Sequence, residues 1–147
     1  MRKLYLLCLN LLVTINAHAF PCFITVAKDS CWTNYDVTVR VIDAHTNQQF
    51  GQIILPKGKS VAVLSFQCDP SQVFMLNAQF SPIIWQNDAG KMYSSQSYLT
   101  LPSAVKPGEV GWNFSTCYPS DFAGVPMPPT ATNSCKCDFS SAPKPTL

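Results

Sequence analysis

Cysteine is the residue type in this chain whose spacing most directly suggests chemistry. Cys135 and Cys137 are separated by one residue, and ten residues follow Cys137 in the sequence. Such a pair can bind a soft metal ion, exchange with disulfides, or form bridges to other cysteines. Because residues two apart in an extended strand point the same way, both sulfurs face one surface and are poorly placed to bond each other. The spacing therefore favours two bridges to different partners, which would hold down the C-terminal segment.

A metal or redox site is the weaker interpretation of the same pair. It would combine Cys135 and Cys137 with His45, the one histidine after the N-terminal segment, which lies in a polar turn. A zinc site needs additional sulfur or imidazole ligands close by. A redox pair usually has two residues between its cysteines and begins a helix, where the dipole lowers a thiol pKa. Neither context is present, so we expect no metal ion and no cofactor.

Catalysis is also poorly supported by the polar residues. A nucleophile would need His45 as its base, and an exposed turn residue is the simpler interpretation of that histidine. The carboxylates are Glu109 and seven aspartates, with no recognisable pairing, and no phosphate-binding glycine loop is present. Asp43, Asp69, Asp88 and Asp121 lie where turns are expected, and aspartate stabilises turns through its own backbone. We expect the protein not to be an enzyme.

Residues 1–19 have the features of a signal peptide. Arg2 and Lys3 give a positive start, residues 4–15 form an apolar run, and Ala17 and Ala19 supply the small residues of a cleavage site. The run is shorter than the roughly 20 apolar residues that span a bilayer. The sequence thus predicts cleavage before Phe20, export, and no direct membrane insertion.

Cleavage would leave six of the seven cysteines, an even number that predicts a disulfide framework in an exported chain. A local bridge between Cys22 and Cys31 is one option. The C-terminal pair has Cys117 and Cys68, or the N-terminal strand, as alternative partners. A core bridge from Cys68 to Cys117 would need a bulge, because strict alternation places them on opposite faces. The predicted disulfide cysteines are Cys22, Cys31, Cys68, Cys117, Cys135 and Cys137.

The charge balance argues against two classes of partner. Ten Lys and Arg, less Arg2 and Lys3, leave eight cations against eight Asp and Glu, a net charge of zero. A nucleic-acid binder needs a basic surface, and binding to acidic membranes needs one too. Charged residues are 12% of the chain, against about 25% in typical globular proteins. Either the surface relies on Ser, Thr, Asn and Gln, or partners cover part of it, since lasting interfaces are depleted in charge.

Short alternating segments between turns indicate β-structure. In residues 36–42, Val37, Val39 and Val41 share one face, which is the strand period. Residues 60–66 are apolar on both faces and predict a central strand. We expect an all-β fold over residues 20–118, an antiparallel sandwich or small barrel of about seven or eight short strands. The expected strands are residues 22–28, 36–42, 49–55, 60–66, 72–80, 92–101 and 110–118.

The composition changes after Tyr118. Residues 119–147 are rich in proline, which cannot donate a sheet hydrogen bond, and predict an irregular tail. A bridge that closes a loop of about 15–20 residues contributes roughly 3 kcal/mol of stability. The cysteines of the tail are therefore sufficient to hold it against the sandwich.

Several aromatic residues are candidates for a protein interface. Trp112, Phe114, Phe74 and Phe80 follow the inward pattern and are expected in the core. Aromatic residues near turns or on mixed faces are instead favoured anchors of protein interfaces when they are exposed. The candidate interface residues are Trp32, Trp85, Tyr118 and Phe122.

Three stretches carry a resemblance to a known family. The chain has "FPCFITVAKDSCW" after the leader, "CYPSDF" after the last expected strand and "SCKCDF" near its end. It resembles the small cysteine-rich accessory subunits of bacterial type IVB (Dot/Icm-type) secretion systems, at the periphery of the outer-membrane core complex. The resemblance implies the periplasmic side of the outer membrane, neighbouring structural subunits and no catalysis.

The leading hypothesis is thus a non-catalytic structural or interaction subunit of a bacterial envelope assembly, with protein partners. The alternative is a freely secreted binding protein, such as an inhibitor, an adhesin-like module or an effector, with an unknown ligand. A metal or redox protein that uses Cys135 and Cys137 is the third hypothesis.

Overall fold

The structure, a computed structural model, describes residues 20–144 and consists of strands joined by turns and two short 3-10 helices. The predicted signal peptide, residues 1–19, lies outside the described residues. The elements in chain order are β1 (Phe20–Lys28), η1 (Ser30–Trp32), β2 (Asp36–Asp43), β3 (Gln49–Leu55), β4 (Val61–Cys68), β5 (Val73–Ser81), η2 (Gln86–Asp88), β6 (Tyr93–Ser94), β7 (Leu99–Thr100) and β8 (Trp112–Tyr118).

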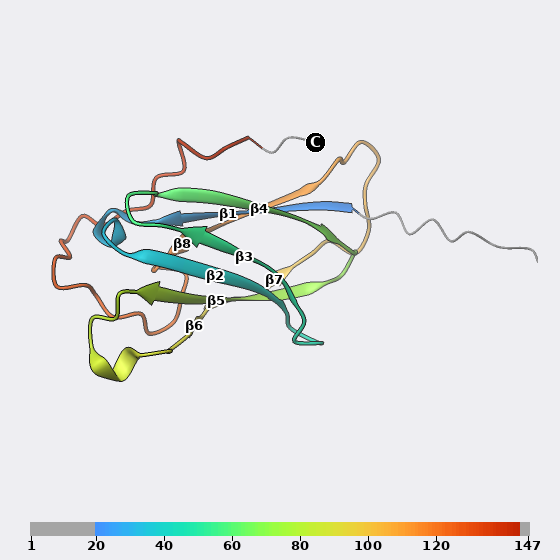
Figure 1. Cartoon of the computed structure of the whole chain (residues 1–147). Helices are drawn as coiled ribbons and strands as arrows, with labels where there is room; N and C mark the ends of the chain where they lie inside the picture. Colours follow the sequence, from blue (N-terminus) through green and yellow to red (C-terminus); the bar gives the residue numbers. More distant parts are fainter. Residues whose placement is uncertain (1–19, 145–147) are drawn as a thin grey trace, which may run out of the picture.

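The strands form two sheets that pack face to face (Figure 1). One sheet has three strands in the order β4-β1-β8, and the other has five, in the order β3-β2-β5-β6 with β7 also paired to β5. The predicted all-β sandwich is confirmed. Its inner faces hold the core, since Val37, Val39 and Val41 of β2 are fully buried, as are Ile24 and Val26 of β1. Full burial of such side chains stabilises by about 1.5–3 kcal/mol each before entropy is counted.

The direction of one strand pair differs from the expected antiparallel arrangement. β1 and β8 run parallel, with Cys22 opposite Trp112. The two strands lie at opposite ends of the chain, so no hairpin dictates how they pair. A Cβ at Gly111 would lie 2.9 Å from the ring of Phe23 and 3.1 Å from the carbonyl oxygen of Pro21. Glycine therefore permits β8 to enter beside β1.

The expectation that residues 60–66 form a central strand is wrong. β4 is an edge strand, and β1 occupies the centre of its sheet. β1 has buried side chains on both faces, including Phe23 and Ala27 on the outer one. Val61 of β4 lies opposite Ala27 and is also buried. The apolar residues on the outer face of β4 thus show that other parts of the chain cover this face. They do not show that β4 lies in the centre of its sheet.

The expected strand over residues 92–101 is divided in two. β6 pairs with β5 at Asn77 and Ala78, and β7 pairs with β5 at Val73 and Phe74. The polar residues 95–98 separate them, and Ser95 forms an isolated bridge to Phe122. The tail thus takes a position beside the broken strand.

The two ends of the sandwich carry different connections. β1, β5 and β8 all finish at the end on the left of Figure 1, where β2 and β4 begin. We call this the loop end; it is formed by residues 29–35, 56–60, 82–92 and 119–137. The β2–β3 turn, which carries His45, lies at the opposite end.

Candidate docking surface

All six cysteines of the described chain form disulfides. The bridges are Cys22–Cys68, Cys31–Cys135 and Cys117–Cys137. The structure confirms the prediction that Cys135 and Cys137 bond to two different cysteines. It also confirms Cys117 as one of these two partners. The other is Cys31, which follows the N-terminal strand.

Two of the predicted alternatives are wrong: the local bridge from Cys22 to Cys31, and the bridge from the tail to Cys68. Antiparallel pairing of β1 with β4 places Phe66 opposite Cys22, so Cys68 is a diagonal neighbour on the inner face, with a Cα–Cα distance of 6.0 Å. A bridge from Cys68 to Cys117 is excluded as well, because β1 lies between β4 and β8. The pairing follows from strand register, which was not known from the sequence.

Lys28 ties the two sheets together at the loop end. Its side chain is buried, and its Nζ donates to the carbonyl oxygens of Tyr35, Leu55 and Pro56 at 2.6, 3.3 and 3.0 Å. Burial lowers the pKa of Lys28, and the charge of Asp36 partly opposes that shift. The ammonium group therefore braces the turns of the loop end, and among residues 20–144 it forms no ion pair with a carboxylate.

The first turn of the tail is held by Asp121. Its carboxylate accepts the backbone N–H of Cys117 at 2.7 Å and the hydroxyl of Thr116 at 3.2 Å. Its own N–H donates to the carbonyl oxygen of Cys117 at 2.9 Å. The next contact joins the N–H of Ala123 to the carbonyl oxygen of Ser94 at 2.8 Å. The tail thus begins as a folded turn on the sandwich.

Three of the four candidate interface residues are not exposed. Trp32, Tyr118 and Phe122 have exposed fractions of 0%, 0% and 3%. They form an aromatic cluster in which the Trp32 ring lies 4.8 Å from Phe80 and Phe122 lies 5.6 Å from Tyr118. The structure therefore corrects the prediction that these three residues are exposed interface residues, because they belong to the core. The turns that carry them fold over the open end of the sandwich, so the rings close the core.

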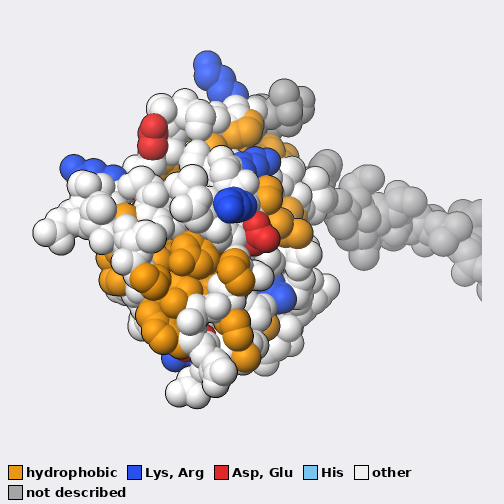
Figure 2. Space-filling model, turned by 60° about the vertical axis from the view of Figure 1, so that its left-hand side comes forward, with side chains coloured by type: hydrophobic (Ala, Val, Ile, Leu, Met, Phe, Trp, Pro, Cys, Tyr) orange, Lys and Arg blue, Asp and Glu red, His pale blue; other side chains and the backbone are white. Residues whose placement is uncertain are grey.

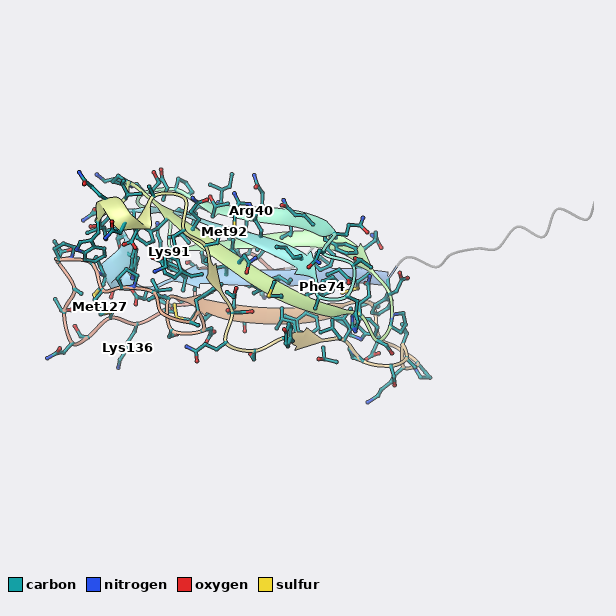
Figure 3. All side chains as sticks on the ribbon, turned by 90° about the horizontal axis from the view of Figure 1, so that it is seen from below. Arg40, Phe74, Lys91, Met92, Met127 and Lys136 are labelled. Atoms are coloured by element: carbon teal, nitrogen blue, oxygen red, sulfur yellow. A yellow bond between two sulfur atoms is a disulfide. The ribbon has the colours of Figure 1, made fainter. Side chains whose placement is uncertain are left out.

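Trp85 is exposed, and Ile83, Met92 and Met127 are further exposed apolar residues of the loop end. The exposed fractions are 41% for Trp85, 49% for Ile83 and 54% for Met127. We call these three residues the end patch. Ile84 lies between Ile83 and Trp85, and Val125 lies two residues before Met127; both are partly buried and pack against the core. Figure 2, turned toward the loop end, shows hydrophobic side chains gathered on this face, and Figure 3 places Met127 at the end that carries η2.

The segment that carries Trp85 is internally hydrogen-bonded. The N–H of Asp88 donates to the carbonyl oxygen of Trp85 at 3.0 Å, and the N–H of Lys91 donates to that of Asp88 at 3.1 Å. Beyond it, Tyr93 is buried and stacks on Phe80. A surface that is ordered before binding loses less conformational entropy on association. The end patch is therefore a preorganised surface.

Lysines accompany the end patch. Figure 3 places Lys91 and Lys136 at the same end of the molecule as Met127. The Nζ of Lys91 lies 3.9 Å from the carboxylate of Asp88 and 5.2 Å from the centre of the Tyr93 ring. Lys136 is exposed. The arrangement suits a partner surface that combines apolar side chains with carboxylates.

The residues of the predicted metal or redox alternative do not come together. Cys135 and Cys137 are bonded to different cysteines, and His45 is exposed at the opposite end of the sandwich. Asp43 stabilises the turn of His45 by accepting the N–H groups of His45 and Thr46 at 2.8 and 2.9 Å. These bonds lower the pKa of Asp43. The role of Asp43 as a turn former is confirmed.

A different trio does come together, and it was not predicted. Carboxylate and sulfur atoms of Asp29, Cys31 and Cys135 lie within 4.8 Å of one another. The sequence carried one usable signal, because Asp29 and Cys31 have the same alternate spacing as the C-terminal pair. Only the fold shows that these two segments meet.

In comparisons with known proteins, no protein-family model, curated protein or solved structure matches the chain. Among residues 20–144, no helix is long and apolar enough to cross a membrane. The three disulfides indicate an oxidising compartment outside the cytoplasm.

Proposed function

We propose that this protein is a non-catalytic interaction subunit of a bacterial envelope assembly that binds a protein partner through its loop end. The observation that carries the proposal is the end patch, where Ile83, Trp85 and Met127 are each exposed by two fifths or more. Aromatic and methionine side chains are enriched at the centres of protein interfaces. Exposed apolar side chains that gather on one face typically mark an interaction site.

The bracing of the loop end supports the same function. The bridges Cys31–Cys135 and Cys117–Cys137 and the buried Lys28 all act on the segments around the end patch. A surface held in one shape suits a permanent structural contact.

The location is proposed from the resemblance together with the disulfides. An oxidising compartment is consistent with the periplasmic face of the outer membrane, where the accessory subunits of type IVB secretion systems lie.

Gentle affinity purification from detergent-solubilised envelopes, with identification of the co-purifying proteins, tests the proposal. A defined set of envelope proteins should accompany the wild-type chain and be lost from the Trp85→Ser/Met127→Ser variant. Val110→Ser is the matched control, because Val110 is 59% exposed and precedes β8 at the opposite end. Recovery of a monodisperse free monomer from the periplasm would contradict the proposal.

A second candidate function is a freely secreted binding protein. It is favoured by the three bridges within the chain and by the core that the two sheets enclose, since both features suit a domain that acts alone. Measuring the distribution between envelope and culture medium separates the two functions. A majority of the protein in the medium would support free secretion.

A further inference from the structure

The bridge between Cys31 and Cys135 lies beside a buried carboxylate. Asp29 is 6% exposed, and its Oδ1 accepts the N–H of Cys31 at 2.9 Å. A second bond, from the N–H of Trp32 to the carbonyl oxygen of Asp29 at 3.1 Å, closes the turn of η1. The side chain of Trp32 is fully buried. Cys31 therefore keeps its position whether or not its sulfur is bonded to Cys135.

The position of Cys135 is also independent of that bond. The next residue, Lys136, accepts the N–H of Ser30 with its carbonyl oxygen at 3.1 Å. The residue after that, Cys137, is bonded to Cys117. Because Lys136 and Cys137 are both held in place, Cys135 cannot move far from Cys31. Opening the bridge would thus leave two thiols facing each other beside Asp29.

The bridges differ in their accessibility to a reductant. Cys22 and Cys68 are buried, whereas the cysteines of the other two bridges, Cys31–Cys135 and Cys117–Cys137, are all partly exposed. The contacts of the Cys31 and Cys135 sulfurs with residue 132 lie in exposed surroundings. The sulfur of Cys137 lies near backbone oxygens in partly buried surroundings. A small dithiol should therefore reach the bridge beside Asp29 first.

We propose that selective reduction of Cys31–Cys135 opens a binding site for a soft divalent cation such as Zn²⁺, with Asp29 as the third ligand. The dithiol transfers two electrons and two protons, the S–S bond becomes two thiols, and the reductant becomes its own disulfide. Zn²⁺ then binds both sulfurs as thiolates and releases their two protons to solvent. A water molecule completes four-coordination.

The geometry and the charge suit this ion. Zn–S bonds of about 2.3 Å at a tetrahedral angle place two sulfurs about 3.8 Å apart, within reach of cysteines whose Cα atoms lie 5.4 Å apart. The Asp29 carboxyl is 6% exposed, and its oxygen and the two sulfurs lie within 4.8 Å of one another. Two thiolates beside that carboxylate would repel one another. A divalent cation offsets this repulsion.

The test uses the exported, fully oxidised chain and limiting dithiothreitol. Peptide mapping first verifies that Cys31–Cys135 alone has opened, and Zn²⁺ binding is then measured by native mass spectrometry and by competition with a chromogenic chelator. We expect one Zn²⁺ per selectively reduced chain and none on the oxidised chain. Asp29→Asn should weaken binding by about tenfold or more, because even the loss of an outer-shell partner of a zinc ligand typically has an effect of that size.

Three results would overturn the inference. These are absence of Zn²⁺ from the selectively reduced wild type, unchanged Zn²⁺ affinity in Asp29→Asn, and stoichiometric binding by Cys31→Ser/Cys135→Ser after the same treatment. Because the Asp29→Asn variant keeps every cysteine, it tests the site even if the double variant fails to fold. The result of the Zn²⁺ test is independent of the proposed docking function, because the end patch is tested with all three disulfides closed.

Discussion

The indole ring of Trp32 packs edge-on against the phenol ring of Tyr118, with the ring centres 5.1 Å apart and the planes at 76°. Trp32 follows β1 and Tyr118 ends β8, so the contact joins two segments from opposite ends of the chain. Both rings are fully buried. This pair closes the core at the loop end, directly beneath the turns that carry the end patch.

Truncation of Trp32 should therefore destabilise the fold strongly. We expect Trp32→Ala to lower the free energy of unfolding by about 3–5 kcal/mol, as for other buried large aromatics. Trp85→Ala is the matched control, because Trp85 is 41% exposed and exposed positions usually change stability by less than about 0.5 kcal/mol. Denaturant unfolding at constant m value measures both. Equal effects of the two substitutions would contradict the burial assigned here.

Removal of the Tyr118 hydroxyl should cost little. Its oxygen is buried without a hydrogen-bond partner among residues 20–144, and burial raises the pKa of the phenol. Replacing an unpaired buried polar group by an apolar group of the same shape is nearly neutral or stabilising. Tyr118→Phe should thus keep the melting temperature or raise it. A fall in the free energy of unfolding of more than about 1 kcal/mol would mean that the hydroxyl is hydrogen-bonded after all.

The bridge Cys117–Cys137 should contribute measurable stability. It joins residues 20 positions apart, and a loop of that length corresponds to about 3 kcal/mol in the chain-entropy estimate. Cys117→Ala/Cys137→Ala should lower the free energy of unfolding by about that amount and expose residues 119–134 to limited proteolysis. The wild-type chain with all bridges intact is the reference. Unchanged protection of these residues would show that other contacts hold the tail.

Asp43 should make stability depend on acid pH. Its folded-state pKa lies below the ordinary value of 3.8 because the backbone N–H groups of Thr46 and His45 stabilise the carboxylate. The stabilisation is therefore fully present above pH 3.8 and is lost as the pH falls through the folded-state pKa. Asp43→Ala should flatten this part of the stability profile. An NMR titration that places the carboxyl above its ordinary pKa would contradict the assignment.

The sequence was sufficient for the fold class and for most strands. Alternation in residues 36–42 and 72–80 predicted β2 and β5, because one face of each strand is buried and the other is not. The parallel pairing of β1 with β8 could not be predicted from the sequence, because strand direction in a sheet depends on contacts between distant segments. The edge position of β4 was missed for the same reason, because an apolar outer face does not reveal what covers it.

The candidate site could be predicted only in part. Cysteine spacing showed that the C-terminal pair binds two partners, but the partners depend on strand register and on where η1 lies. Aromatic residues near turns were candidates for an exposed docking surface. Trp85 is exposed, whereas Trp32 and Phe122 are buried because their turns fold inward over the end of the sandwich. Position relative to a turn does not decide the direction of a side chain.

In-cell photo-crosslinking tests the docking role of the loop end most directly. A photoreactive amino acid placed singly at positions 85 and 127 should give discrete adducts with one or a few envelope proteins, with all three disulfides closed. The same amino acid at position 110, which is exposed at the opposite end, should give none of these adducts. Absence of adducts at 85 and 127, or equal adducts at 110, would contradict the end patch as the docking surface.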